Sequence, residues 1–368
     1  MSGSEGVMSW SLPQGDPRVA QALSSGWLET TKGERTRAVA RGLVRPGSPG
    51  AAPEVLFEAL PAVERPAGVA PWLLAVRAYS LTATVTPCLA VALLLLVQGA
   101  QASWGMAALA IVGVCLLQMS INLFNDIEDY RKLIDLPGTL GGSGVIQKGW
   151  WSPAELRRLA WGALFLGAAA GLPSVIASSG SLYWISLLAG LGVLGYSARR
   201  FGLKYNALGD VAVFILCGPA LTTGFAIAAT RGATVSPGVL WVGAWFGLLA
   251  MALLHINNVQ DMHLDRSRGV RTLALILGFQ GSLVFNVLLH LAAPASLVAG
   301  VWLGHLPTAA LLGVLVHAAV AGPWVLRVSR ALGPESALLS RCRIRAAQIH
   351  LLGGLGLCVG LLIARAIT

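Results

Sequence analysis

Long uncharged apolar runs are the feature that most constrains how this chain of 368 residues can fold. Each run is about twenty residues, enough for a helix to cross a bilayer. Charged residues make up only 11% of the chain, whereas soluble domains contain about 25%. We therefore predict an all-α polytopic membrane bundle of about nine transmembrane helices. The predicted spans are 72–98, 103–124, 157–178, 181–198, 207–229, 237–257, 272–303, 307–327 and 345–366.

The charged residues between the spans predict the orientation. The net charge is +10, and in a soluble protein such a charge would suggest nucleic-acid binding. Here Lys and Arg lie between spans, and the connections alternate between charged and bare. By the positive-inside rule, the N-terminus and every charged connection are cytoplasmic, and the C-terminus is outside. We expect a multi-pass protein of a bacterial inner membrane that binds no nucleic acid. The charged connections are 125–156, 199–206, 258–271 and 328–345.

Residues 1–68 differ in composition from the rest, because they are polar and contain many Gly, Pro and Ser residues. A short surface helix within 17–44 is compatible with this sequence. The repeated Gly and Pro breaks favour a mostly flexible cytoplasmic extension, followed by a membrane domain over 69–368. The extension contains no recognisable motif, so we expect it to be dispensable for chemistry.

Acidic and amide side chains gather where the second predicted span ends, in the segment 122–149. Asn122, Asn125, Asp126 and Asp129 are spaced at i, i+3, i+4 and i+7, so a continuing helix would place them on one face. Glu128 lies off that face, and we expect it to be solvated or paired with Lys132. Asp135 lies beyond the helix, where a supporting role and a capping role are equally compatible with its position.

A second segment, 255–269, repeats the pattern. Asn257, Asp261 and Asp265 step by four residues, and Asn258 lies beside them. Carboxylates brought close together repel one another and require cations. Hard oxygen ligands favour Mg²⁺ or Ca²⁺, and protein-bound Mg²⁺ usually carries a substrate phosphate. Both segments lie on the same predicted side of the membrane, so we predict a Mg²⁺ site with Asp126, Asp129, Asp261 and Asp265 as catalytic groups.

Further cations and polar groups occur at the same ends of the spans. Cations near metal-bound carboxylates suit a polyanion such as diphosphate, whose oxygens accept charge-assisted hydrogen bonds. The spans are rich in Gly and Ala, which let helices approach closely around a groove for an apolar tail. For Arg77 and Arg200, a role in topology alone explains the charge equally well. The candidate substrate-binding residues are Arg77, Asn122, Asn125, Lys148, Tyr196, Arg200, Lys204, Asn257, Asn258 and Arg271.

These residues carry a family resemblance. The pattern N-x-x-N-D-x-x-D, then G-V-I-Q-K-G with S-P-x-E, then N-N-x-x-D-x-x-x-D-x-x-x-G-x-R-T-L resembles the UbiA superfamily of intramembrane prenyltransferases. The resemblance covers about 72–366 and looks closest to the branch that prenylates 1,4-dihydroxy-2-naphthoate in menaquinone synthesis. It implies helices around a central cavity, a polyprenyl diphosphate bound through Mg²⁺, and an aromatic acceptor.

Carried onto this chain, the resemblance implies a first Mg²⁺–diphosphate group of Asn122, Asp126 and Asp129. It implies a second group of Asn257, Asp261 and Asp265, and it makes Lys148 and Arg271 clamps for the diphosphate. Three positions depart from the family pattern. Arg200 replaces a Lys, and Gly144 and Gln260 stand where Arg is common in the naphthoate branch. These departures weaken the assignment of the acceptor, but they do not weaken the assignment as a prenyltransferase.

Three other functions compete with naphthoate prenylation. One is prenyl transfer to 4-hydroxybenzoate or to a non-quinone lipid. Another is a CDP-alcohol phosphotransferase, which needs D-G-x-x-A-R where this chain has Tyr130, Arg131 and Lys132. The third is a transporter that uses intramembrane acids, for which we would expect acids near the bilayer centre. The acids here gather at the ends of spans, so a prenyltransferase is the favoured prediction.

Overall fold

The computed structural model describes residues 8–44, 52–60, 64–137, 142–199, 201–233 and 235–367. The chain divides into two compact units. The first contains 1–79 and 119–163, and the second contains 80–118 and 164–368. This division differs from the predicted boundary at residue 68, because the segment with the first acidic motif belongs to the same unit as the N-terminal residues.

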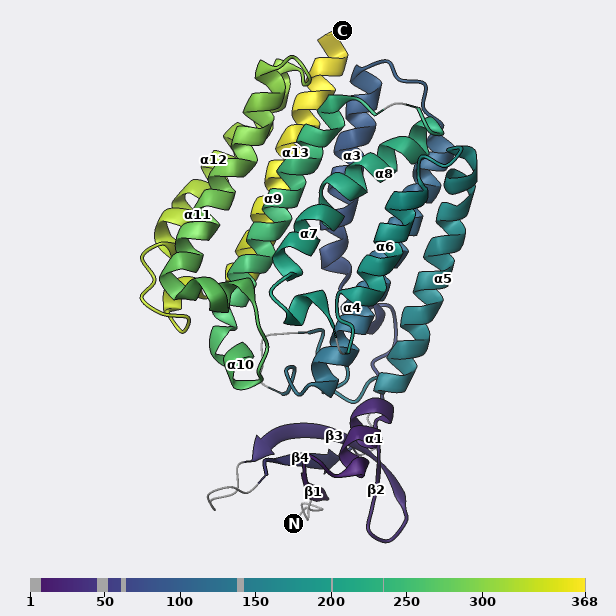
Figure 1. Cartoon of the computed structure of the whole chain (residues 1–368), viewed down its shortest axis with the longest axis vertical. Helices are drawn as coiled ribbons and strands as arrows, with labels where there is room; N and C mark the ends of the chain where they lie inside the picture. The colour runs from purple at the N-terminus through teal and green to yellow at the C-terminus, as the bar shows by residue number, and fades with distance from the viewer. Residues whose placement is uncertain are drawn as a thin grey trace. The chain divides into compact units, whose positions relative to one another are not determined.

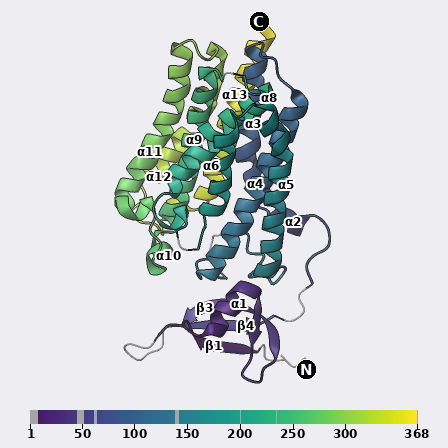
Figure 2. The ribbon, with the colours of Figure 1, turned by 45° about the vertical axis from the view of Figure 1, so that its right-hand side comes forward.

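The N-terminal residues form an antiparallel sheet of four strands, in the order β1-β4-β3-β2. A helix, α1 (Pro17–Ser25), contacts this sheet (Figures 1 and 2). It begins at Asp16, whose carboxylate accepts from the Arg18 amide, and it ends at Gly26, whose φ of 83° suits glycine. The strands are β1 (Ser9–Pro13), β2 (Trp27–Glu29), β3 (Arg35–Val44) and β4 (Glu54–Ala59).

The expectation of a mostly flexible extension is therefore wrong for the described residues. Strand β4 shows why, because Val55 and Phe57 are two residues apart, lie on one face of the strand and are completely buried. They share one hydrophobic core with Ile127 and Tyr130 near the end of α4 (Trp104–Arg131) and with Val145. Of the Gly residues that suggested disorder, Gly15 and Gly33 lie in the short turns that follow β1 and β2.

Two further helices complete the first unit. Helix α2 (Ala70–Ala75) precedes the first span, and the first turns of α5 (Pro153–Ala177) follow the motif segment. The S-P-x-E string is a capping box for α5, because Ser152 Oγ accepts from the Glu155 amide at 3.2 Å and Glu155 Oε2 accepts from the Ser152 amide at 2.6 Å. These two residues therefore have a structural explanation.

The second unit is a bundle of membrane-length helices. Eight helical segments among the described residues are long and apolar enough to cross a membrane, and α6 (Tyr183–Gly195) is a shorter apolar helix at the place of the predicted span 181–198. The prediction of about nine spans is confirmed, with eight helices of full membrane length and one shorter apolar helix. The remaining helices are η1 (Ala78–Leu81), α3 (Thr82–Val97), η2 (Leu203–Tyr205), α7 (Gly209–Cys217), α8 (Pro219–Thr230), α9 (Pro237–Gln260), α10 (Met262–Ser267), α11 (Leu273–Trp302), η3 (Thr308–Ala310), α12 (Leu311–Val328), η4 (Ala337–Leu339) and α13 (Cys342–Ile367).

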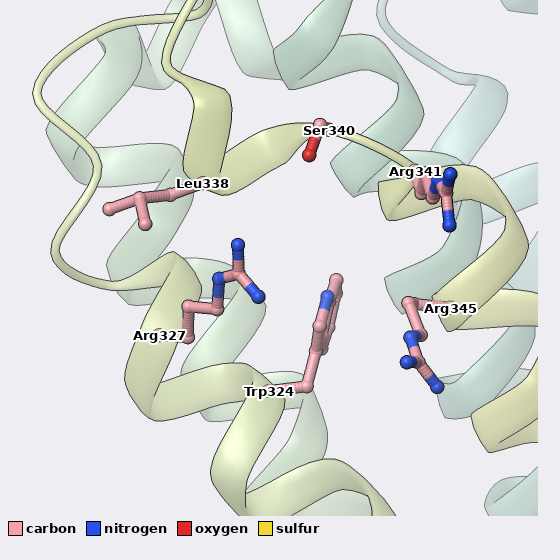
Figure 3. Close-up of a pocket in the computed structure, with 6 residues that line it drawn as sticks. All are labelled: Trp324, Arg327, Leu338, Ser340, Arg341 and Arg345. Carbon is pink, nitrogen blue, oxygen red and sulfur yellow. The ribbon is translucent and has the colours of Figure 1, made fainter.

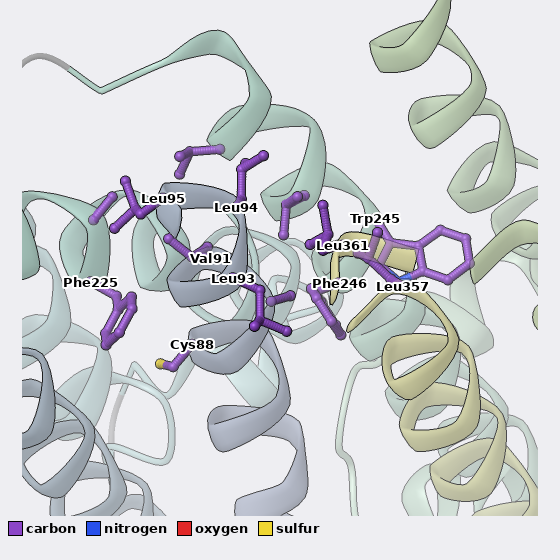
Figure 4. Close-up of a cluster of buried hydrophobic side chains, with 14 of the residues drawn as sticks. Cys88, Val91, Leu93, Leu94, Leu95, Phe225, Trp245, Phe246, Leu357 and Leu361 are labelled. Carbon is purple, nitrogen blue, oxygen red and sulfur yellow. The ribbon is translucent and has the colours of Figure 1, made fainter. Parts of the chain in front are cut away.

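Helix α9 is central to this bundle, since it contacts α3, α7, α8, α11 and α13 (Figure 1). Its Trp245 and Phe246 are completely buried in a cluster with Leu94 and Leu357 (Figure 4). At the break between α7 and α8, a Cβ on Gly218 would lie 2.5 Å from the Gly243 carbonyl oxygen. Only glycine allows this close approach to α9.

The first prediction tests the N-terminal core. Phe57→Ala should destabilise the first unit by about 3–5 kcal/mol, because it removes a fully buried aromatic ring and leaves a cavity. Limited proteolysis of the membrane-inserted protein should then cut within residues 1–60 much faster than in the unchanged protein. Trp27→Ala is the control, since that ring is 47% exposed. Equal protease resistance of both variants would contradict the packed core.

Candidate functional site

The first acidic motif lies on a buried face of α4, within the first unit. The helix continues to Arg131, as the spacing of the acids required. All four members of the predicted face are at most 7% exposed, and they are Asn122, Asn125, Asp126 and Asp129. Glu128 instead forms an ion pair with Arg131 at 2.8 Å rather than with Lys132. Buried polar groups on a helix of membrane length require partners or a ligand.

Asp126 has two kinds of partner in the structure. Its carboxylate forms an ion pair with Arg77, and it accepts hydrogen bonds from the Ser143 amide at 3.1 Å and from the Ser143 hydroxyl. Burial disfavours the charged form of Arg77, but the combined attraction of the surrounding groups, of which Asp126 is the strongest, outweighs this effect, so the pKa of Arg77 is raised. The structure thus brings Arg77 to the acidic face, as the sequence predicted.

The loop after α4 holds the Ser143 donors in place. Gly142 has a φ of 65°, and a Cβ there would lie 2.3 Å from Asp135 Oδ2 and 3.5 Å from Asp126 Oδ1. Only glycine permits this backbone to approach both carboxylates. Asp135 is buried, and its carbonyl oxygen accepts from the Gln147 side chain at 2.7 Å. The loop therefore forms a cradle of backbone and hydroxyl donors beside the carboxylates.

Strand β3 holds the other end of this loop. Arg37 donates to the Gly149 carbonyl at 2.8 Å, and Arg41 donates to the Gln147 carbonyl at 3.3 Å. The Tyr130 hydroxyl, one residue after Asp129, accepts from the Ala40 amide of the same strand at 2.9 Å. These contacts join residues that are 90 to 112 positions apart in the sequence. Sequence spacing cannot reveal them, and the sequence analysis missed all of them.

The predicted clamp Lys148 and the predicted ligand Asn122 have other contacts. The Lys148 side chain is exposed, and its ammonium lies 4.6 Å from the centre of the Trp150 ring. The structure therefore does not bring Lys148 to the acidic face as the predicted clamp. The Asn122 side-chain amide donates to the Val76 carbonyl at 2.9 Å and fastens α4 to the residue preceding Arg77.

The second acidic motif lies in the second unit, where α9 gives way to α10. The Asp261 amide donates to the Asn257 carbonyl at 3.1 Å, and the Asp265 amide donates to the Asp261 carbonyl at 2.9 Å, so the step of four residues is kept across the break. The Asp261 carboxylate forms an ion pair with Arg343 of α13. The Asn257 side-chain oxygen is buried and accepts no hydrogen bond within the described part of the chain. Such an oxygen lacks the partner that buried polar atoms normally have.

Asn258 points away from this group. It donates to Asp210 Oδ2 at 3.4 Å, and the other oxygen of Asp210 lies 2.9 Å from Nδ1 of His255. Asp210 and His255 are at most 1% exposed. This polar contact ties α7 to α9 and thereby fixes the helix that carries Asn257. The sequence analysis did not identify this pairing.

The remaining predicted residues lie near the segment that follows the second motif. Arg271 is exposed, and its carbonyl accepts from the Ala207 amide at 2.7 Å, which brings it beside the residues after η2. The Lys204 ammonium lies 5.8 Å from the Tyr205 ring, and the Lys204 amide donates to the Tyr196 carbonyl at 3.0 Å. Arg200 lies outside the described residues.

The donor chemistry of both groups fits Mg²⁺. Each offers carboxylate and amide oxygens and no soft ligand, as Mg²⁺ requires. The cradle at Gly142 and the unsatisfied Asn257 oxygen are the two features that favour an additional ligand. Among the described residues, no three His, Cys, Asp or Glu side chains are arranged to hold a metal ion. Asp126 and Asp261 are each neutralised by an arginine instead.

Comparison with known proteins identifies the family. The sequence model of the UbiA prenyltransferase family matches residues 84–340. The 1,4-dihydroxy-2-naphthoate octaprenyltransferase of Haemophilus influenzae is 29% identical over 267 residues, which cover 68% of this chain and 83% of that protein. The Escherichia coli protein of the same name is 31% identical over 178 residues, covering 47% of this chain and 57% of that protein.

Solved structures share the fold. The apo structure of a UbiA homolog from Aeropyrum pernix K1 has a TM-score of 0.57 at 22% identity and covers 76% of this chain and 97% of that chain. The structure of a UbiA homolog from Archaeoglobus fulgidus bound to GPP and Mg²⁺ has a TM-score of 0.52 at 15% identity, with 78% and 99% covered. Since the family model matches well over half of the chain, this multi-pass membrane protein belongs to the UbiA prenyltransferase family and is a membrane prenyltransferase.

Proposed function

We propose that this protein transfers a polyprenyl group from a polyprenyl diphosphate to 1,4-dihydroxy-2-naphthoate in a reaction that depends on Mg²⁺. The observation that carries the proposal is the buried face of α4, where Asp126 and Asp129 lie beside the donors Arg77 and Ser143. Acids and donors side by side suit a diphosphate that arrives with a cation. The names of the Haemophilus influenzae and Escherichia coli relatives supply the acceptor.

Asn122, Asp126 and Asp129 would hold one part of the metal–diphosphate group, and Asn257, Asp261 and Asp265 the other. Bound Mg²⁺ would neutralise charge on the departing diphosphate. Arg77 and Ser143 would donate to phosphate oxygens, and their burial makes such hydrogen bonds strong. A Mg²⁺ complex of the Archaeoglobus fulgidus homolog supports this assignment of a cofactor. We further propose that the prenyl tail and the acceptor bind in a central cavity between the helices.

The apolar helices of this chain would protect the reactive prenyl cation from water. As the allylic carbon–oxygen bond breaks, positive charge develops on the prenyl group, and the electron-rich naphthoate ring attacks it. Gly- and Ala-rich helices with apolar side chains would keep water away from this cation. By the positive-inside rule, we place the site at the cytoplasmic face, because the connections after α4, α6, α9 and α12 carry the basic residues.

The second prediction compares two adjacent acids of α4. Asp129→Asn should reduce prenyl-transfer turnover on the order of a hundredfold, because it removes charge stabilisation at the diphosphate. Glu128→Gln is the matched control and should change turnover about twofold at most, since Glu128 pairs with Arg131 away from the face. Both variants should insert normally into membranes. If the two variants lost equal activity, the assignment of this helical face would be wrong.

The third prediction concerns the acceptor. In the naphthoate branch, prenylation is accompanied by loss of the ring carboxylate, whereas prenylated 4-hydroxybenzoate keeps it. Membranes given Mg²⁺, a polyprenyl diphosphate and carboxyl-labelled 1,4-dihydroxy-2-naphthoate should release labelled carbon dioxide together with a prenylated product. The same membranes given labelled 4-hydroxybenzoate should release none. A prenylated hydroxybenzoate without any naphthoate product would refute the acceptor and leave the proposed diphosphate chemistry intact.

The fourth prediction concerns the N-terminal sheet, which the sequence analysis expected to be dispensable. Arg37→Gln with Arg41→Gln should lower kcat by roughly tenfold or more, because two charge-assisted bonds that hold the 142–149 loop are lost. Arg35→Gln, an exposed change in the same strand, should have little effect. The double Lys variant should recover part of the rate, which a purely unfolded protein would not do. Full kcat in a well-inserted protein lacking residues 1–60 would show that the sheet is not needed.

A further inference from the structure

A cavity of about 340 Å³ lies between the end of α12 and the beginning of α13, within the second unit. Figure 3 shows the side chains that line it, with the Trp324 ring between the Arg327 and Arg345 side chains. None of the residues that line it belongs to the proposed prenyl-transfer site. The lining residues are Trp324, Arg327, Leu338, Ser340, Arg341 and Arg345.

The described residues that line the cavity carry positive charge and include no acid that would compensate it. Its lining contains three arginines and no Asp or Glu. The one acid of the 328–345 connection, Glu335, lies 3.2 Å from His263 and is largely exposed. Arg345 donates to the neutral Gln348 side chain at 3.1 Å. Three cations around one cavity repel one another, so an anion that enters the cavity would be favoured.

The beginning of α13 separates these cations from the acidic motif. The Arg345 amide donates to the Arg341 carbonyl at 3.0 Å, so the two side chains are one helical turn apart. Arg343 lies between them in sequence and on another side of the helix, where it pairs with Asp261.

The lining chemistry indicates a phosphate with an apolar neighbour. Planar guanidinium groups bind phosphate oxygens in pairs, and the Ser340 hydroxyl offers a further donor. Trp324 and Leu338 provide apolar surface beside the donors, and tryptophan is characteristic of the membrane interface. We infer that this cavity binds a phosphate-bearing anion, either the headgroup of an anionic phospholipid or a soluble phosphate.

The test uses the full-length protein in nanodiscs of phosphatidylcholine, with and without phosphatidylglycerol. Native mass spectrometry counts the phosphatidylglycerol molecules that remain bound. Arg327→Gln with Arg345→Gln removes the two cations on either side of Trp324. Arg199→Gln with Arg330→Gln is the charge-matched control, since both residues are exposed and do not line the cavity. Ser340→Asp is a second test variant that keeps all the arginines and places a negative charge among them.

If the headgroup is the ligand, the unchanged protein should retain one more phosphatidylglycerol molecule than either the Arg327/Arg345 double variant or the Ser340→Asp variant. The control double variant should retain as many as the unchanged protein. A soluble ligand would appear instead as a rise in melting temperature with inorganic phosphate, lost in the same two variants. Equal lipid loss in the test and control doubles would show diffuse attraction and overturn the site. The proposal would also fail if neither probe distinguished the variants.

Discussion

A carboxylate buried at the end of a membrane helix must have compensating charge or donors, and the first unit is arranged around this constraint. An uncompensated ion in such surroundings costs several kcal/mol, even after relaxation. Asp126 obtains compensation from Arg77, which adopts an unfavourable positive φ of 52° just before the first span. It also obtains donors from Ser143, which the glycine at 142 allows to approach. Segments on both sides of α4 in the sequence therefore supply this one buried acid with a charge and with hydrogen-bond donors.

The N-terminal sheet contributes indirectly to the stabilisation of the buried Asp126 carboxylate, because it holds the loop that donates to it. A loop that supplies donors to a carboxylate is useful only if it is held, and its backbone carbonyls are fixed by Arg37 and Arg41 of β3. The hydrophobic core beneath these contacts includes Phe57 from the sheet and Ile127 from α4. The segment of mixed composition that precedes the spans is thus part of the folding unit that contains the first motif.

The sequence allows prediction of those features that depend on local periodicity. Runs of apolar residues gave the spans, and a 3.6-residue period gave the buried face from Asn122 to Asp129. It does not reveal contacts between distant segments, such as Arg343 with Asp261 across 82 positions. Short strands such as β4 were missed because Gly and Pro around them are equally typical of loops. Asn258 has the spacing of a ligand but pairs with Asp210, a partner on another helix.

In each of the two motifs, one aspartate is neutralised by an arginine. Substituting such an arginine would therefore have two effects at once, one on the free protein and one on the complex. Asp126 pairs with Arg77 and Asp261 with Arg343, each from a different segment of the chain. In the proposed complex with Mg²⁺ and diphosphate, the cation would neutralise the acids, and the two arginines would be available to donate to phosphate oxygens. Replacing either arginine would therefore leave a carboxylate uncompensated in the free protein and also remove a donor in the complex. The acids themselves, and their neighbours off the buried face, separate these effects more cleanly than the arginines do.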